Sequence, residues 1–140
     1  MRAPRPITHG LFLGGDDGPR LLAGACADCR RLHFPAAPWC PYCGASGCGT
    51  TPIGPDGRLH LYTVVATPPP GYRGAVPYGF GVVDLPEGLR VVTRLTESDL
   101  ARLAPGLPMR LVVEPLFTDD DGTPVLSYAF APAAPGESAP

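Results

Sequence analysis

Two pairs of cysteines are the residues of this sequence whose type and spacing most clearly indicate chemistry. Cys26 and Cys29 form one Cys-x-x-Cys pair, and Cys40 and Cys43 form a second after ten intervening residues. Two such pairs at hairpin separation bring four thiolates to one tetrahedral point, which is the coordination that a structural zinc ion requires. The short loops let backbone amides point at the sulfurs and offset their charge. The sequence therefore predicts a structural zinc site with these four ligands.

The other thiol and imidazole groups lack such a pattern. Cys48 follows the second pair and is expected to be a bystander thiol, although it could replace a ligand. His33 lies between the pairs and would bind metal only if a cysteine were displaced, so a non-ligand role is favoured. His9 and His60 have no carboxylate or nucleophile at motif spacing. We expect both to be structural.

Composition and charge restrict the functional classes. The chain has 140 residues, a formal net charge of −2 and a pI of about 5.8, so no global field attracts it to nucleic acid or to an anionic membrane. No apolar run approaches the length of a membrane span, and the first residues lack a signal-peptide core. We expect a cytoplasmic protein, in which thiols stay reduced and a four-cysteine cluster binds metal rather than forming disulfides.

The elements that position the cysteines are expected to be short strands, because 20 prolines and 18 glycines disfavour long helices. A strand over residues 20–25 leads into the first pair, and Phe34 with Trp39 would form the small apolar core of the metal hairpin. A zinc unit this small cannot fold on burial alone, so metal binding and folding should be one event. We predict an N-terminal arm (1–19), a zinc ribbon (20–50), a barrel (51–131) and a flexible tail (132–140).

The second part of the chain has the pattern of a small β-barrel. Five short strands are predicted, over residues 58–67, 78–85, 89–95, 109–117 and 123–130. A capping pattern at Thr96–Asp99 predicts a helix of one or two turns before the fourth strand, with Leu100 and Leu103 on its buried side. This order is that of a five-stranded OB-fold. The fold class is therefore mostly β: an N-terminal rubredoxin-like zinc ribbon followed by an OB-fold barrel.

Two local patterns within the barrel have a structural interpretation. Gly79 and Gly81 fall on one side of the second strand, where missing side chains permit sharp coiling. The acidic run Asp119–Asp121 lacks the spaced ligands and closing glutamate of a calcium loop, so a solvated hairpin tip is favoured.

The ribbon followed by the run PYGFGVVDLPEGLRVVTRLTESDL (77–100) resembles a known family, the small zinc-ribbon/OB-fold proteins that accompany thiolase-like enzymes acting on acyl-CoA. The runs PITHGLF (6–12) and PRLLAGACADC (19–29) are most similar to the small subunit of benzoylsuccinyl-CoA thiolase and its relatives. The resemblance implies a thiolase-like partner that carries the catalytic cysteine and histidines. It also implies that this chain docks on the partner and helps to form or cover the acyl-CoA channel. One departure is Arg30, which follows Cys29 where a glycine is common.

The loop 67–77 is the predicted place for the coenzyme A ester, a ligand shared with the partner. It joins the first two barrel strands, a position that OB-folds commonly use for ligands. Tyr72 and Arg73 offer stacking and phosphate pairing, and Tyr78 and Phe80 follow with alternate side chains on one face. These four residues are the predicted ligand-binding set. The alternative is an ordinary exposed loop with an incidental arginine.

Three other functional classes have weaker support in the sequence. A single-stranded nucleic-acid binder would use Tyr78 and Phe80 interleaved with Arg90 and Arg94, but the negative charge and the lack of a basic cluster beyond Arg30–Arg31 disfavour it. Iron with electron transfer is suggested by the rubredoxin-like CPYCG run, although rubredoxins are stand-alone modules. No triad, paired carboxylates or phosphate loop supports an independent enzyme. We therefore predict no catalytic residue and a non-catalytic subunit of a thiolase-type hetero-oligomer.

Overall fold

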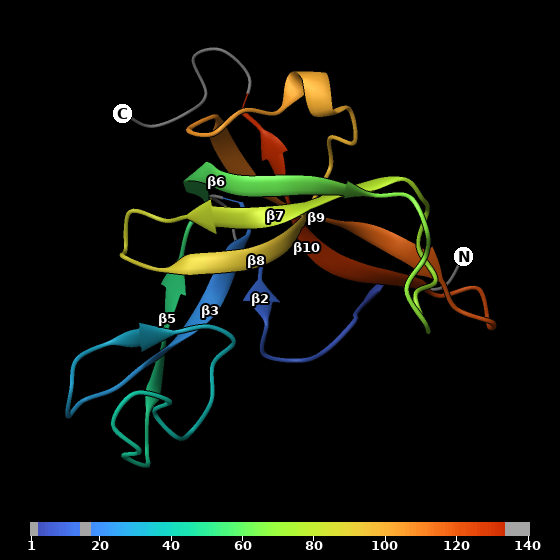
Figure 1. Ribbon diagram of the computed structural model, residues 1–140. Helices are drawn as coiled ribbons and strands as arrows, with labels where there is room; N and C mark the ends of the chain where they lie inside the picture. The colour runs from blue at the N-terminus through green and yellow to red at the C-terminus, as the bar shows by residue number, and fades with distance from the viewer. Residues whose placement is uncertain (1–2, 15–17, 134–140) are drawn as a thin grey trace.

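The computed structural model describes residues 3–14 and 18–133, which form two connected β-sheets (Figure 1). The smaller sheet contains β2 (Phe12–Leu13), β3 (Arg20–Ala25), β4 (Leu32–His33) and β5 (Gly49–Ile53). β3 is its central strand and pairs antiparallel with each of the other three. The cysteine loops extend from the end of this sheet, as a zinc ribbon requires.

The larger sheet closes into a barrel. Its five main strands are β6 (Asp56–Val65), β7 (Tyr78–Asp84), β8 (Arg90–Leu95), β9 (Pro108–Thr118) and β10 (Pro124–Pro132). The order β6-β7-β8-β10-β9 returns to β6, with β8 and β10 parallel and the other pairs antiparallel. This is the strand order of an OB-fold. The predicted fold class is confirmed.

A short N-terminal strand adds to the barrel. β1 (Arg5–Pro6) pairs parallel with the start of β10, and the backbone N–H of Ile7 donates to the carbonyl of Leu126 over 2.8 Å. The Arg5 guanidinium lies 2.6 Å from Asp119 in the β9–β10 turn. The arm predicted at residues 1–19 thus contacts the barrel where it is described, whereas most of the predicted tail, 134–140, lies outside the described residues.

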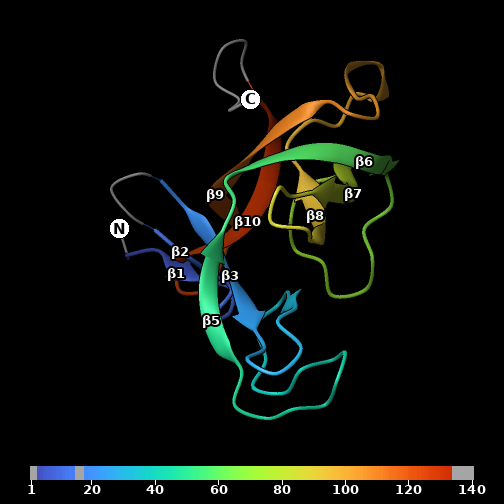
Figure 2. The same ribbon diagram turned by 90° about the vertical axis from the view of Figure 1, so that its left-hand side faces the viewer.

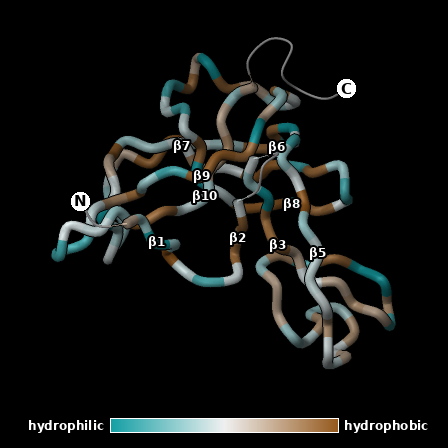
Figure 3. Tube along the Cα trace, turned by 180° about the vertical axis from the view of Figure 1, so that it is seen from behind, coloured by the Kyte–Doolittle hydropathy of each residue, from teal (hydrophilic) through white to brown (hydrophobic). Residues whose placement is uncertain are grey.

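One hydrophobic core joins the ribbon to the barrel. Leu21 and Ile53, from β3 and β5, belong to the same buried cluster as Met109 and Phe130 from the barrel. Figure 2 shows β3 and β5 running side by side into the barrel wall, and Figure 3 shows hydrophobic segments of β2 and β3 at that junction. The base of the ribbon is therefore part of the barrel core.

The two glycines of β7 fit the coiling that their spacing predicts. A Cβ atom on Gly79 would overlap the carbonyl oxygen of Glu97, and one on Gly81 would overlap that of Leu61. Backbone therefore packs directly against β7 on its inner side, which only glycine permits.

The predicted helix is a single 3-10 turn, η1 (Leu100–Arg102), whose N-cap Asp99 accepts a hydrogen bond from the Ala101 amide. Leu103 is buried as expected, but Leu100 is 55% exposed, because one 3-10 turn does not provide a continuous buried face. No helix in the described part of the chain is long and apolar enough to span a membrane.

Candidate metal centre and ligand-binding surfaces

The structure brings the four predicted metal ligands together. The Sγ atoms of Cys26, Cys29, Cys40 and Cys43 all lie within 4.8 Å of one another. The Cys26–Cys43 and Cys29–Cys40 sulfur pairs are 3.6 and 3.5 Å apart. Tetrahedral zinc with Zn–S bonds of about 2.3 Å places its sulfurs roughly 3.8 Å apart. The four side chains therefore fit a zinc ion with little adjustment.

The two cysteine loops share one backbone geometry. The Arg30 amide donates to the Cys26 carbonyl over 3.0 Å, and the Gly44 amide donates to the Cys40 carbonyl over 2.9 Å. Both donors have positive φ, 65° for Arg30 and 78° for Gly44. The arginine that departs from the family pattern thus adopts the left-handed conformation that glycine adopts in the second loop.

Backbone amides also favour thiolates at the site. The amides of Cys29 and Tyr42 each lie 3.4 Å from a ligand sulfur, that of Cys26 and of Cys40 respectively. The Cys29 amide is the main reason that the pKa of Cys26 falls to about 6. The Ala45 amide favours the Cys43 thiolate, but contact with the Cys26 sulfur and desolvation raise the pKa of Cys43 to about 12. A raised pKa of this kind keeps a thiol protonated until a cation displaces the proton.

The residues expected to be non-ligands lie outside the cluster. Cys48 Sγ is 4.0 Å from the Ala45 carbonyl oxygen, and desolvation is the first cause of its raised pKa. His33 is buried, and its Nε2 accepts from the Ala37 amide over 3.1 Å. His60 Nδ1 lies 3.5 Å from an Asp84 carboxylate oxygen.

The apolar centre of the metal hairpin differs from the prediction. Phe34 packs edge-on against Tyr128 of the barrel, with ring centroids 5.6 Å apart. Trp39, its expected partner, is 64% exposed. The prediction treated the ribbon as a separate unit, whereas the barrel supplies the aromatic partner of Phe34.

The predicted ligand loop folds back on itself and on the barrel. The Tyr72 hydroxyl donates to the Ala75 carbonyl over 2.8 Å, and its ring lies 4.8 Å from that of Tyr78. Arg73 lies 3.1 Å from Asp120 and 3.5 Å from Asp119. A ligand phosphate would therefore compete with two carboxylates for Arg73.

A pocket of about 300 Å³ lies between this loop and the barrel. Tyr72 and Tyr78 line it together with Arg94 and Glu114, whose side chains form an ion pair of 3.0 Å. Arg94 Nε is buried without a hydrogen-bond partner. The sequence singled out Arg94 only as a strand neighbour of Arg90, and no local pattern places Glu114 of β9 opposite it.

Phe80 faces a different surface, the outer face of β6, β7 and β8. The register aligns Leu61 with Val82 and Val82 with Val92 across the three strands. Leu61 and Val92 are 55% and 57% exposed, and Phe80 is 38% exposed. We call Leu61, Phe80, Val82 and Val92 the outer apolar face. Alternation along single strands indicated Phe80 but not this cross-strand row.

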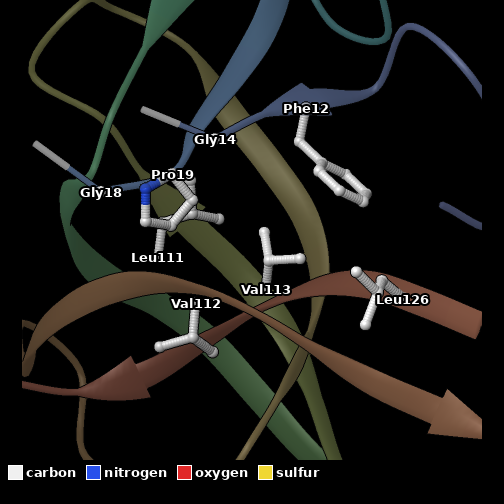
Figure 4. A pocket seen from close by; sticks show the side chains of 8 residues that line it. All are labelled: Phe12, Gly14, Gly18, Pro19, Leu111, Val112, Val113 and Leu126. Atoms are coloured by element: carbon white, nitrogen blue, oxygen red, sulfur yellow. The ribbon is translucent and has the colours of Figure 1, made fainter. Parts of the chain in front are cut away.

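A second, larger pocket of about 490 Å³ separates β2 from β9 and β10. Figure 4 shows Phe12 of β2 facing Val113 and Leu126 across it. The described residues that line it are all apolar or glycine: Phe12, Gly14, Gly18, Pro19, Leu111, Val112, Val113 and Leu126. They offer hydrophobic contact, and none of these eight residues is an acid, a base or a nucleophile.

Comparison with known proteins places both parts of the chain. Family models of the ChsH2 rubredoxin-like zinc ribbon and of the ChsH2 C-terminal OB-fold domain match residues 17–50 and 50–114. A DUF35 domain-containing scaffold protein of Pyrococcus furiosus is 30% identical over 84% of this chain and 87% of its own length. The benzoylsuccinyl-CoA thiolase subunit BbsA of Thauera aromatica is 31% identical over 80% and 76%. The solved Ltp2-ChsH2(DUF35) aldolase is similar, with a TM-score of 0.64 and 30% identity over 82% of this chain and 86% of that one.

Proposed function

Because the chain belongs to the DUF35 family, in which a rubredoxin-like zinc ribbon precedes an OB-fold, we propose that it is a non-catalytic subunit of a thiolase-like acyl-CoA complex. The similarity to a benzoylsuccinyl-CoA thiolase subunit over three quarters of that subunit is the observation that carries the proposal. It agrees with the resemblance noted in the sequence. The partner would perform the thiolysis, condensation or aldol-type cleavage.

The four cysteines would hold zinc in a structural role. All four ligand positions are filled by side chains of this chain, and such closed sites stabilise a fold rather than activate water. The ion would neutralise the thiolates and fix the two loops relative to β3 and β4. Zinc would thus contribute folding energy and no reaction chemistry.

The outer apolar face is the surface that we assign to the partner. Its central row, Leu61, Val82 and Val92, crosses three strands without a polar residue, and exposed apolar rows of this kind are typical of protein–protein interfaces. Burying this face against a larger subunit would also bring Phe80 into the interface. The OB-fold would then exclude water from one side of the partner's channel.

The acyl-CoA would lie beside the loop 67–77. Tyr72 and Tyr78 line the pocket under the loop, so they would contact the apolar parts of the ligand. Arg73 would exchange its carboxylate partners, Asp119 and Asp120, for a ligand phosphate. These residues would bind and orient the ester while the partner's groups react with it.

Coexpression with a thiolase-like protein encoded by a neighbouring gene tests the proposal. We expect the two chains to copurify in fixed stoichiometry and the complex to cleave or form an acyl-CoA that neither chain handles alone. A chain that stays monomeric, ignores every thiolase homologue and binds oligonucleotides at physiological salt would overturn it in favour of the nucleic-acid alternative.

A further inference from the structure

Arg30 and Arg31 are adjacent, and they differ from most of the described arginines in that they form no ion pair among the described residues. Six described arginines form an ion pair with a carboxylate: Arg5, Arg73, Arg90, Arg94, Arg102 and Arg110. Arg30 and Arg31 form none with any described residue. Arg31 instead lies with its Cζ 5.0 Å from the ring centroid of Tyr42. Within the described part of the chain, two adjacent positive charges therefore have no carboxylate partner, although the net charge of the protein is −2.

The backbone at Arg30 adopts a conformation that is unusual for a residue with a side chain. Its φ of 65° belongs to the left-handed region, and the equivalent residue of the second cysteine loop is Gly44. A side chain is disfavoured in this conformation, whereas glycine adopts it freely. Unfavourable backbone conformations of this kind concentrate at functional sites. The arginine is thus present at a position where glycine would give a more stable loop.

Both arginines line a groove of about 360 Å³ between the ribbon and the barrel. Tyr42, which is 51% exposed, forms part of the ribbon wall. Glu87 and Leu89 of the β7–β8 turn form the opposite wall. The Gly54 amide donates to Glu87 Oε2 over 3.2 Å, so the turn is tied to the link between β5 and β6. The groove is therefore built from elements that are fixed to one another.

We propose that this groove binds the phosphate group of a phosphorylated ligand. Two guanidinium groups provide charge-assisted, bidentate donors for phosphate oxygens. Tyr42 and Leu89 offer a flat and an apolar surface beside them for the remainder of the ligand. Within the groove lining, Glu87 contributes one negative charge and the two arginines contribute two positive ones. The neighbouring zinc–thiolate cluster is also negative, so the arginines would bind the phosphate by direct hydrogen bonds. Asp28, in the same cysteine loop, lines a separate hollow.

A purely structural role for the arginines makes a different prediction. Zinc with four thiolates carries a charge of about −2, and Arg30 and Arg31 could serve only to offset it. In that case Arg30→Gly lowers zinc affinity and stability. If the arginine is retained to bind a ligand, Arg30→Gly removes backbone strain and raises the melting temperature while it weakens ligand binding.

The test uses the zinc-loaded full chain, titrated calorimetrically with pyrophosphate in a phosphate-free buffer of low ionic strength. We expect saturable binding that weakens with added salt, and at least about tenfold weaker binding in Arg30→Gly and in Arg31→Gln. Arg58→Gln, at an exposed arginine outside the groove, should bind as the wild type does. Glu87→Gln should bind more tightly, because it removes the opposing charge.

Ligand arms separate the sources of the phosphate. ADP and coenzyme A present phosphates beside an adenine, and adenosine is the control that lacks them. Binding of pyrophosphate and ADP but not adenosine supports the inference, whether or not coenzyme A binds. The inference fails if the wild type binds none of the phosphates, or if Arg30→Gly and Arg31→Gln, with normal zinc content, bind them unchanged. It concerns the chain alone, so its outcome is independent of the proposed partner.

Discussion

Among single residues, Cys40 has the clearest consequence. Its sulfur is buried, lies 3.5 Å from that of Cys29 and is approached by the Tyr42 amide. Zinc requires an ionised ligand at this position. A serine hydroxyl stays protonated at neutral pH, so it cannot replace the thiolate. We expect Cys40→Ser to lose most bound zinc and to accumulate as insoluble or unfolded chain, since structural zinc supplies about 10 kcal/mol in small domains.

Metal analysis and a melting curve check this prediction. Cys48→Ser is the matched control, because its Sγ lies outside the cluster, and it should keep full zinc content. A Cys40→Ser protein with normal zinc and an unchanged melting curve would remove Cys40 from the ligand set.

Arg73 tests the proposed ligand loop. It stacks over the Phe117 ring at 4.6 Å and pairs with Asp119 and Asp120, but its side chain is 45% exposed, so Arg73→Ala should leave the fold intact. If the arginine binds a ligand phosphate, kcat/KM of the reconstituted complex should fall about tenfold. Arg90→Ala, which removes another exposed ion pair, is the control. Unchanged kinetics in Arg73→Ala would exclude that role.

At the scale of elements, the attachment of β1 to β10 is predicted to depend on pH. The hydrogen bond from Arg5 is the main cause that lowers the pKa of Asp119. Because this folded-state pKa lies below the unfolded value of about 3.9, the pair stabilises the attachment above that pH. Its contribution is lost as the pH falls through the lower folded-state value. Below about pH 4 the β1 strand should therefore open more often.

Hydrogen exchange at the Ile7 amide reports this opening, since that amide donates to Leu126 across the β1–β10 pair. Asp119→Asn should lower the protection factor of this amide several-fold at neutral pH. Acid should lower it by a similar factor in the wild type, once the observed rate is divided by the intrinsic rate at each pH. Asp120→Asn changes the neighbouring carboxylate, which has no contact with Arg5, and should leave the exchange unchanged. Equal exchange in all three proteins would contradict the role of the pair.

The elements also show how far sequence reasoning extends. The barrel strands lie within two residues of their predicted bounds, because Gly and Pro punctuation and alternation are local signals. The cysteine spacing is also a local signal, and it predicted the four side chains whose sulfurs the structure brings together. Leu100 was misplaced because the length of a capped turn depends on what packs against it. Trp39 was misplaced because Tyr128, almost ninety positions further along the chain, takes its role. Long-range partners of this kind leave no mark in a local pattern.

At the scale of the whole molecule, the outer apolar face determines where a partner can dock. Leu61 and Leu100 are equally exposed, at 55%, but only Leu61 belongs to that face. We expect Leu61→Asp to weaken the complex with a thiolase-like subunit at least about tenfold, because it buries an unpaired charge in the interface. Leu100→Asp should bind as the wild type does.

Calorimetry measures the affinity of Leu61→Asp and Leu100→Asp for the partner. Circular dichroism confirms that both variants are folded. If both variants bind the partner normally, docking uses another surface. If both bind weakly, the leucine on η1 is also in the contact, and the face that we assign is too narrow.

The continuous core has a thermal consequence. Leu21, Ala23 and Ile53, which are rooted beneath the cysteine loops, occupy the same buried cluster as the barrel residues, so neither part keeps a closed interior once the other opens. Heating should therefore give one calorimetric peak instead of two. Removal of the ion by a chelator should shift that whole peak to a lower temperature, because metal binding in the small hairpin sets the melting temperature of the entire chain.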